Sequence, residues 1–149
     1  MDVSGNISAI LGQKSAEIFS VSPEATVFEA ITMMDEKNVG ALLVMEGEKL
    51  VGMFSERDYT RKVVLRGKRS RETKVAEIMS SNLIVTHLQE GVEKCLRLMT
   101  DKRIRHLPVL DGEKVIGIIS IGDLVKWVIS CQSATIAHLE NYISGGYTG

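Results

Sequence analysis

Hydrophobic residues along the first half of the chain change their spacing in a way that separates helix from strand. Over residues 27–34 they fall at i, i+3, i+4 and i+7, which is typical of an amphipathic helix. Two short apolar runs follow at 41–45 and 50–54, separated by Glu46 and Gly47. Because glycine readily adopts the positive φ of a tight turn, the two runs predict an antiparallel hairpin.

The same pattern returns 65 residues later. Helical spacing recurs over 92–99, and two apolar runs at 107–110 and 115–119 flank Asp111 and Gly112. The amino-acid sequences of the two halves also align, since VMEGEKLVGMFSERD in the first half corresponds to VLDGEKVIGIISIGD in the second without a gap. A period of 65 seen twice is longer than the 20 to 50 residues of solenoid and propeller repeats, so it predicts two small subdomains that share one core.

Each repeat is completed by a short extended segment and a second helix. Extended segments are expected at 18–21 and 83–86, and the second helices at 57–65 and 123–130, so each repeat reads β-α-β-β-α. A helical turn at 7–11 precedes the first repeat, and another at 75–79 precedes the second. We expect these turns to bridge the halves.

The expected fold class is α/β, in the α+β sense, with the two units packed sheet to sheet. A unit of about 50 residues buries too little surface to be stable alone. The tail after Cys131 should begin as a helix and fray at Gly145-Gly146. The predicted boundaries are 1–16 for an N-terminal helical segment, 17–66 for the first unit, 67–80 for a linker and bridging helix, 81–131 for the second unit, and 132–149 for a C-terminal helix and tail.

Composition excludes several classes of protein. No apolar run reaches the roughly 20 residues that a membrane helix needs, and the start of the chain lacks the pattern of a signal peptide, so we expect a cytoplasmic protein. The net charge of −1 argues against a nucleic-acid binder. Residues 61–74 are nevertheless strongly basic, either as a solvated linker or as a docking surface for an acidic partner or a phosphate.

The most informative local motif closes each hairpin. Ser55 and Asp58 in the first repeat, and Ser120 and Asp123 in the second, stand three residues apart where a strand should become a helix. One interpretation is a capping box, in which both side chains satisfy free N–H groups of the helix. The other is a ligand site, because a helix N-terminus favours phosphate and a carboxylate can accept from both hydroxyls of a ribose.

The duplicated β-α-β-β-α unit, the G-h-x-S-x-x-D ending and the pairing of two units resemble a tandem cystathionine-β-synthase (CBS) domain pair, or Bateman module. The resemblance covers about residues 7–130. The segments SERDYTRK, RIRHLPV and SIGDLVKW and the ending LENYISGGY are also similar to the stand-alone CBS-pair proteins of bacteria and plant organelles.

The resemblance implies two clefts that bind an adenosine-containing ligand, such as AMP, ADP, ATP, NAD(H) or S-adenosylmethionine. Arg105 and His106 have only small uncharged counterparts in the first repeat, so the clefts should differ. We expect one of these two residues to contact phosphate and the first cleft to bind more tightly. The first cleft would be formed by Met53, Ser55, Asp58, Leu83 and Ile84, and the second by Ile118, Ser120, Asp123, Ile18, Phe19 and Val39.

The sequence favours regulation over catalysis. The three histidines are scattered, no catalytic or metal-binding motif occurs, and the two cysteines indicate neither a disulfide framework nor a zinc site. The resemblance implies a homodimer that senses energy or redox state and signals to an unknown protein partner. The alternative is an interaction scaffold that docks a partner, with a thioredoxin-like protein as one candidate, without any required ligand.

Overall fold

The computed structural model describes residues 4–14 and 17–148. The predicted 1–16 segment and 132–149 tail therefore lie partly outside the described residues, because 1–3, 15–16 and 149 are not among them. The fold is mixed α/β, as predicted, with two three-stranded sheets ordered β1-β2-β3 and β4-β5-β6. The chain divides into two compact units, one made of residues 17–85 and 110–117 and the other of residues 1–16, 86–109 and 118–149.

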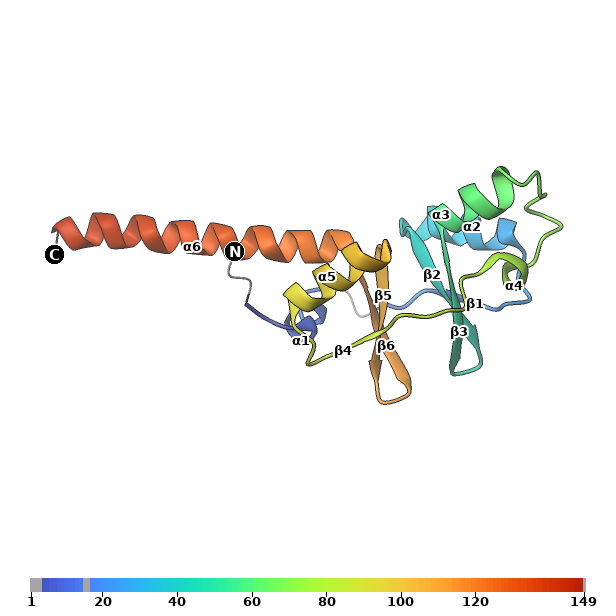
Figure 1. The fold of residues 1–149 in the computed structure, drawn as a ribbon, viewed down its shortest axis with the longest axis horizontal. Coiled ribbons are helices and arrows are strands. Elements are labelled where there is room, and N and C mark those ends of the chain that lie inside the picture. The colour runs from blue at the N-terminus through green and yellow to red at the C-terminus, as the bar shows by residue number, and fades with distance from the viewer. Residues whose placement is uncertain (1–3, 15–16, 149) are drawn as a thin grey trace. The chain divides into compact units, whose positions relative to one another are not determined.

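The first sheet contains the hairpin predicted from the sequence. Strand β1 pairs with β2 in parallel, and β2 pairs with β3 in antiparallel register, with an irregularity at Val44/Met45. Figure 1 shows β2 and β3 joined as a hairpin. Gly47 lies in its turn with φ +60°, the conformation for which a glycine was expected. The strands are β1 (Ser20–Val21), β2 (Ala41–Glu46) and β3 (Lys49–Ser55).

The predicted amphipathic helix is α2 (Val27–Lys37). It begins at Thr26, whose side chain accepts a hydrogen bond from the backbone N–H of Glu29 at 3.1 Å, and it ends at Asn38 in the left-handed conformation. Asparagine is one of the few residues other than glycine that adopt this conformation readily. Local capping therefore fixes both ends of α2.

The helix after this hairpin is not the regular α-helix that was expected over 57–65. A short α3 (Glu56–Asp58) passes into a π-helical segment, η1 (Tyr59–Val64). The wider turn is seen in the hydrogen bond from Leu65 N to the carbonyl of Thr60, five residues earlier, at 3.0 Å. Such segments are rare and frequently occur at functional sites.

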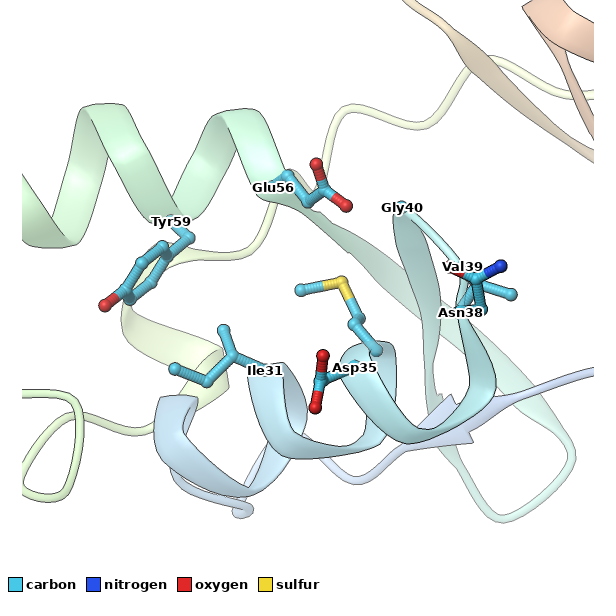
Figure 2. A pocket seen from close by; sticks show the side chains of 8 residues that line it. Ile31, Asp35, Asn38, Val39, Gly40, Glu56 and Tyr59 are labelled. Atoms are coloured by element: carbon cyan, nitrogen blue, oxygen red, sulfur yellow. The ribbon is translucent and has the colours of Figure 1, made fainter.

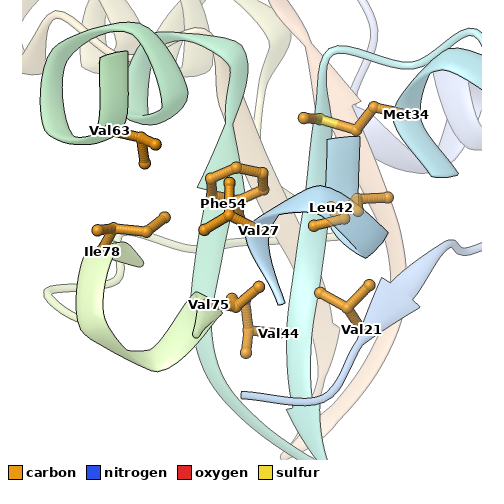
Figure 3. Packing of buried hydrophobic residues seen from close by; sticks show 10 residues of the cluster. Val21, Val27, Met34, Leu42, Val44, Phe54, Val63, Val75 and Ile78 are labelled. Atoms are coloured by element: carbon orange, nitrogen blue, oxygen red, sulfur yellow. The ribbon is translucent and has the colours of Figure 1, made fainter. Parts of the chain in front are cut away.

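A hydrophobic core joins the sheet and helices of this unit. Figure 3 shows side chains from the strands, α2, η1 and α4 (Val75–Ile78) converging on Phe54, which is fully buried. The predicted stripe of α2 supplies Val27, Ala30 and Met34, so the helical spacing did identify the buried face. The cluster consists of Val21, Val27, Ala30, Met34, Leu42, Val44, Phe54, Val63, Val75 and Ile78.

The other unit repeats these elements but ends differently. The predicted second helix and the tail form one continuous helix, α6, which includes the two glycines where fraying was expected (Figure 1). Neither proline nor glycine occurs between Ser130 and Gly145, so no residue stops the helix there. The elements are α1 (Ile7–Leu11), β4 (Thr86–His87), α5 (Val92–Lys102), β5 (His106–Asp111), β6 (Lys114–Ser120) and α6 (Ile121–Thr148).

Each short helical turn belongs to the unit of the other repeat. The first turn, α1, begins where Ile7 N donates to the carbonyl of Glu90 at 3.0 Å, just before α5. The second turn, α4, begins where Val75 N donates to the carbonyl of Ala25 at 2.8 Å, just before α2. The turns therefore each pack within one unit, on a helix that is distant from them in sequence.

Candidate nucleotide-binding site

The first Ser-x-x-Asp motif lies at the end of β3 and forms a complete capping box. Ser55 donates to Asp58 Oδ2 from its backbone N–H at 3.0 Å and from its hydroxyl at 3.1 Å. The backbone N–H of Asp58 donates in return to Ser55 Oγ at 3.2 Å. The capping interpretation of this motif is therefore confirmed, and the carboxylate is held at a fixed position beside the strand end.

The second oxygen of Asp58 is also occupied. Ser80 Oγ donates to Oδ1 at 3.2 Å, and Lys62 Nζ lies 3.0 Å from the same oxygen. Lys62 also donates to the carbonyl of Ile78 at 3.2 Å. Asp58 is only 8% exposed, so these partners replace water around a buried charge.

Met53 and Ser80 hold the linker against β3. Their backbone groups form an isolated antiparallel bridge, with Met53 N donating to Ser80 O at 2.9 Å and Ser80 N donating to Met53 O at 2.8 Å. Met53 is buried at the end of the strand. Leu83 and Ile84 follow on the same linker and are half-buried, but they precede the two-residue strand β4 and are not part of it.

The second motif has the same local geometry. Ser120 N donates to Asp123 Oδ2 at 2.9 Å, and Asp123 N donates to Ser120 Oγ at 3.1 Å. The lysine beside it comes from the N-terminal segment, where Lys14 Nζ donates to Asp123 Oδ2 at 2.8 Å and to the carbonyl of Ile118 at 2.9 Å. Lys14 and the backbone N–H of Ser120 therefore donate to the same carboxylate oxygen, Oδ2 of Asp123.

The ionisable groups of this unit influence one another. Burial alone would raise the pKa of Asp123, but the hydrogen bonds from Lys14 and Ser120 outweigh it, so this pKa is lowered. Burial lowers the pKa of His106, and Lys14 and Arg105 add to that shift while Asp123 opposes it. The histidine is therefore neutral near pH 7, next to a carboxylate that stays ionised.

The remaining predicted residues occupy different environments. Arg105 is exposed, and its carbonyl accepts from Ile121 N at 2.8 Å, which connects the start of β5 to the start of α6. Ile18 is 37% exposed, whereas Phe19 and Val39 are half-buried against the core of their unit. Ile18, Phe19 and Val39 belong to the unit of residues 17–85, while Ile118, Ser120 and Asp123 belong to the other unit.

A cavity of about 330 Å³ lies in the unit of residues 17–85, between α2 and the helix after β3. Figure 2 shows Ile31 and Asp35 on α2, with Tyr59 and Glu56 across the opening. The exposed carboxylates of Asp35 and Glu56 would repel a phosphate. Of the residues that line the cavity, Val39 alone is among the predicted ligand residues. It is lined by Ile31, Met34, Asp35, Asn38, Val39, Gly40, Glu56 and Tyr59.

Two features of the described residues bear on catalysis: the grouping of possible metal ligands and the state of the Cys95 thiol. Among residues 4–14 and 17–148, no three His, Cys, Asp or Glu side chains cluster in a way that could hold a metal ion. Cys95 is buried and lies 3.3 Å from the hydroxyl of Thr86, and burial raises the pKa of its thiol. A thiol in this state is a packing residue rather than a nucleophile. No helix in the described part of the chain is long and apolar enough to span a membrane.

Three partners of the carboxylates were not predicted from the sequence. Lys62 could have been identified, because it stands four residues after Asp58 on one helix face. Ser80 and Lys14 left no such signal, because they lie 22 and 109 residues from the aspartates that they contact.

Comparison with known proteins agrees with this geometry. The family model described as CBS domain matches residues 11–65 and 75–130. The mitochondrial CBS domain-containing protein CBSX3 of Arabidopsis thaliana is 42% identical over 127 residues, which are 82% of this chain and 62% of that protein. The chain therefore spans less than two thirds of the length of this relative.

Solved structures show the same fold. A CBS-domain protein from Burkholderia ambifaria superposes with a TM-score of 0.83 at 46% identity, covering 85% of this chain and 95% of that one. The CBS domain pair of protein MJ0100, solved in complex with 5'-methylthioadenosine and S-adenosyl-L-methionine, superposes with a TM-score of 0.72 at 25% identity, covering 82% of this chain and 98% of that one. Two family matches, one on each repeat, establish that the chain belongs to the CBS domain family as a tandem pair.

Proposed function

We propose that this CBS-pair protein is a non-enzymatic sensor that binds an adenosine-containing nucleotide, AMP, ADP, ATP or NAD(H), and signals its presence to a partner protein. The observation that carries the proposal is the repeated Ser-x-x-Asp geometry. In both repeats a carboxylate is fixed at the junction of a strand and a helix, beside a serine and a lysine.

The chemistry of this arrangement suits a nucleotide. A carboxylate can accept hydrogen bonds from ribose hydroxyls, and bonds to an ionised acceptor are stronger than neutral ones. The adjacent ammonium groups of Lys14 and Lys62 and the exposed guanidinium of Arg105 supply the positive charge that a phosphate requires.

The ligand residues that we propose are those expected from the sequence. Apolar residues beside each carboxylate would contact the adenine, whereas the polar ones would hold the sugar and the phosphate. They are Asp58, Ser55, Met53, Leu83 and Ile84 in one group, and Asp123, Ser120, Ile118, Ile18, Phe19 and Val39 in the other, with Arg105 or His106 at the phosphate.

A related protein supports the class of ligand. The MJ0100 domain pair, with the same fold, was solved with two adenosine compounds, 5'-methylthioadenosine and S-adenosyl-L-methionine. Both compounds share the adenosine group, which is also common to the nucleotides proposed here. The same proposal includes a homodimer and a cytoplasmic location, in which bound ligand would favour one arrangement of the dimer over another.

The test is a melting screen followed by calorimetric titration. A ligand that binds only the folded protein raises the melting temperature by mass action, so AMP, ATP and NADH should each be compared with GMP and with ribose 5-phosphate. We expect a concentration-dependent rise with at least one adenosine compound and none with GMP. Absence of any rise or binding heat with all adenosine compounds would refute the proposal and favour the scaffold alternative.

A further inference from the structure

The two motif carboxylates, Asp58 and Asp123, differ in how many of their oxygens already accept hydrogen bonds. In Asp58, Oδ2 accepts from the backbone N–H and the hydroxyl of Ser55, while Oδ1 accepts from Ser80 and is paired with Lys62. All of these partners belong to the unit of residues 17–85. Neither oxygen of this carboxylate is therefore available to a ligand without breaking an existing bond.

In Asp123 the partners gather on one oxygen. Ser120 N and Lys14 Nζ both donate to Oδ2, at 2.9 and 2.8 Å. Oδ1 accepts no hydrogen bond from the described residues. The side chain is also more accessible, with an exposed fraction of 24% compared with 10% for the side chain of Asp58.

We infer that Asp123 is the carboxylate that accepts a ribose hydroxyl, and that Ser80 and Lys62 hold the corresponding oxygen of Asp58 closed, so that each chain binds one nucleotide tightly. The inference rests on the proposed function and deepens it. It reverses the order of affinity expected from the sequence, where the first cleft was favoured.

The expected difference in affinity between the two carboxylates follows from the hydrogen bonds gained and lost when a ribose hydroxyl binds. A ribose hydroxyl arriving at Asp123 Oδ1 adds a bond to an ionised acceptor that none of the described residues fills. At Asp58 the same hydroxyl must displace the hydroxyl of Ser80, so one bond is formed and one is lost. A bond to a charged group corresponds to about a ten- to hundredfold change in affinity, and the Asp58 position should be weaker by that factor.

Lys62 and Ser80 occupy Oδ1 of Asp58 as a connected pair and not independently. Lys62 Nζ also approaches Ser80 Oγ at 3.4 Å, and Ser80 is fixed by its backbone bridge to Met53. The hydroxyl therefore cannot turn away from Asp58 without loss of a partly buried hydrogen bond to a charged acceptor. Removing that hydroxyl is the smallest change that should open the position.

The experiment is calorimetric titration of the full chain with AMP. The wild type should bind one AMP per chain, and Asp123→Asn should bind about ten- to a hundredfold more weakly. Ser80→Ala should keep the first binding event and add a second. Asp111→Asn, an exposed aspartate at the hairpin turn, is the matched control and should bind as the wild type does. Circular dichroism should confirm that each variant is folded.

Each alternative outcome has a distinct meaning. Two equal binding events in the wild type, unchanged affinity in Asp123→Asn, or a single event in folded Ser80→Ala would overturn the inference while leaving the proposed function in place. Failure of the wild type to bind AMP, ATP or NADH would refute both.

Discussion

Removal of the Asp58 carboxylate should destabilise the fold even in the absence of ligand. The substitution Asp58→Ala leaves the Ser55 backbone N–H, the Ser80 hydroxyl and the Lys62 ammonium without their acceptor. It also removes the reciprocal half of the capping box, although the Ser55 hydroxyl can still accept from the backbone N–H of residue 58. Because the residue is 8% exposed, water reaches these donors only partly.

The magnitude follows from the contacts. Loss of a complete N-cap costs about 1 kcal/mol, and loss of the Asp58 half of the capping box should cost less, because the Ser55 cap remains. Hydrogen bonds to a charged group contribute about 1.5–3 kcal/mol each, but those around one carboxylate are not additive. Lys62 can rehydrate, since 41% of its side chain is exposed. We therefore expect a loss of about 3 kcal/mol, which for a chain of this size lowers the melting temperature by roughly 6–12 °C.

Urea denaturation of the unliganded protein, followed by circular dichroism, measures this loss directly. The matched comparison is Asp123→Ala, which removes the equivalent acceptor of the Ser120 backbone N–H from a more exposed position and should cost about half as much. A loss below about 1 kcal/mol in Asp58→Ala, or a larger loss in Asp123→Ala, would refute the conclusion that Asp58 is the more fully satisfied carboxylate.

Three further measurements test the electrostatics and the packing. The lowered pKa of Asp123 gives stability that is present above about pH 4 and lost as pH falls further, so Lys14→Met should reduce the acid-dependent loss seen in denaturation curves. The lowered pKa of His106 means that the unfolded chain binds a proton first, so stability should fall as pH drops below about 6.5, and His106→Gln should flatten this decline. Gly52→Ala would place a Cβ 2.7 Å from a methionine sulfur and 3.0 Å from a backbone oxygen, and it should cost about 1–3 kcal/mol, whereas Gly12→Ala, with no contact under 3.5 Å, should be nearly neutral in urea denaturation.

Much of the fold could be predicted because it is determined by local periodicity. Helical spacing located α2 and its buried face, since Val27, Ala30 and Met34 do enter the core. The glycine at position 47 marked the hairpin turn because a positive φ is required there. These features depend on a few neighbouring residues, and the sequence displays them directly.

Other features depend on contacts that local periodicity does not encode. The π-helical segment after Asp58 contains neither glycine nor proline, so its wider turn could not be distinguished from an α-helix by spacing alone. The short strands β1 and β4 contain two residues each, fewer than the apolar runs at 18–21 and 83–86 suggested. Hydrogen-bonded partners, and not side-chain pattern, decide where such strands begin and end.

The two repeats place a lysine beside the motif carboxylate by different routes. In the first, Lys62 stands one helical turn after Asp58, so the pair forms within one helix. In the second, the corresponding position is Trp127, whose indole N–H donates to the carbonyl of Ser4 at 2.7 Å. This bond fastens the N-terminal segment to α6, and the same segment carries Lys14.

The N-terminal segment can approach α6 this closely only because residue 5 is a glycine. Gly5 has φ +102°, and a Cβ at this position would lie 2.5 Å from the ring of Trp127. Both repeats thus pair the motif aspartate with a lysine, but the lysine comes from the following helix in the first repeat and from the N-terminal segment in the second. In the first repeat Lys62 and Ser80 both contact Asp58 Oδ1, whereas in the second Lys14 contacts Asp123 Oδ2 and no residue in the described part of the chain donates to Oδ1. On the inference made above, differences between the copies, more than their shared motif, decide which carboxylate would contact a ligand.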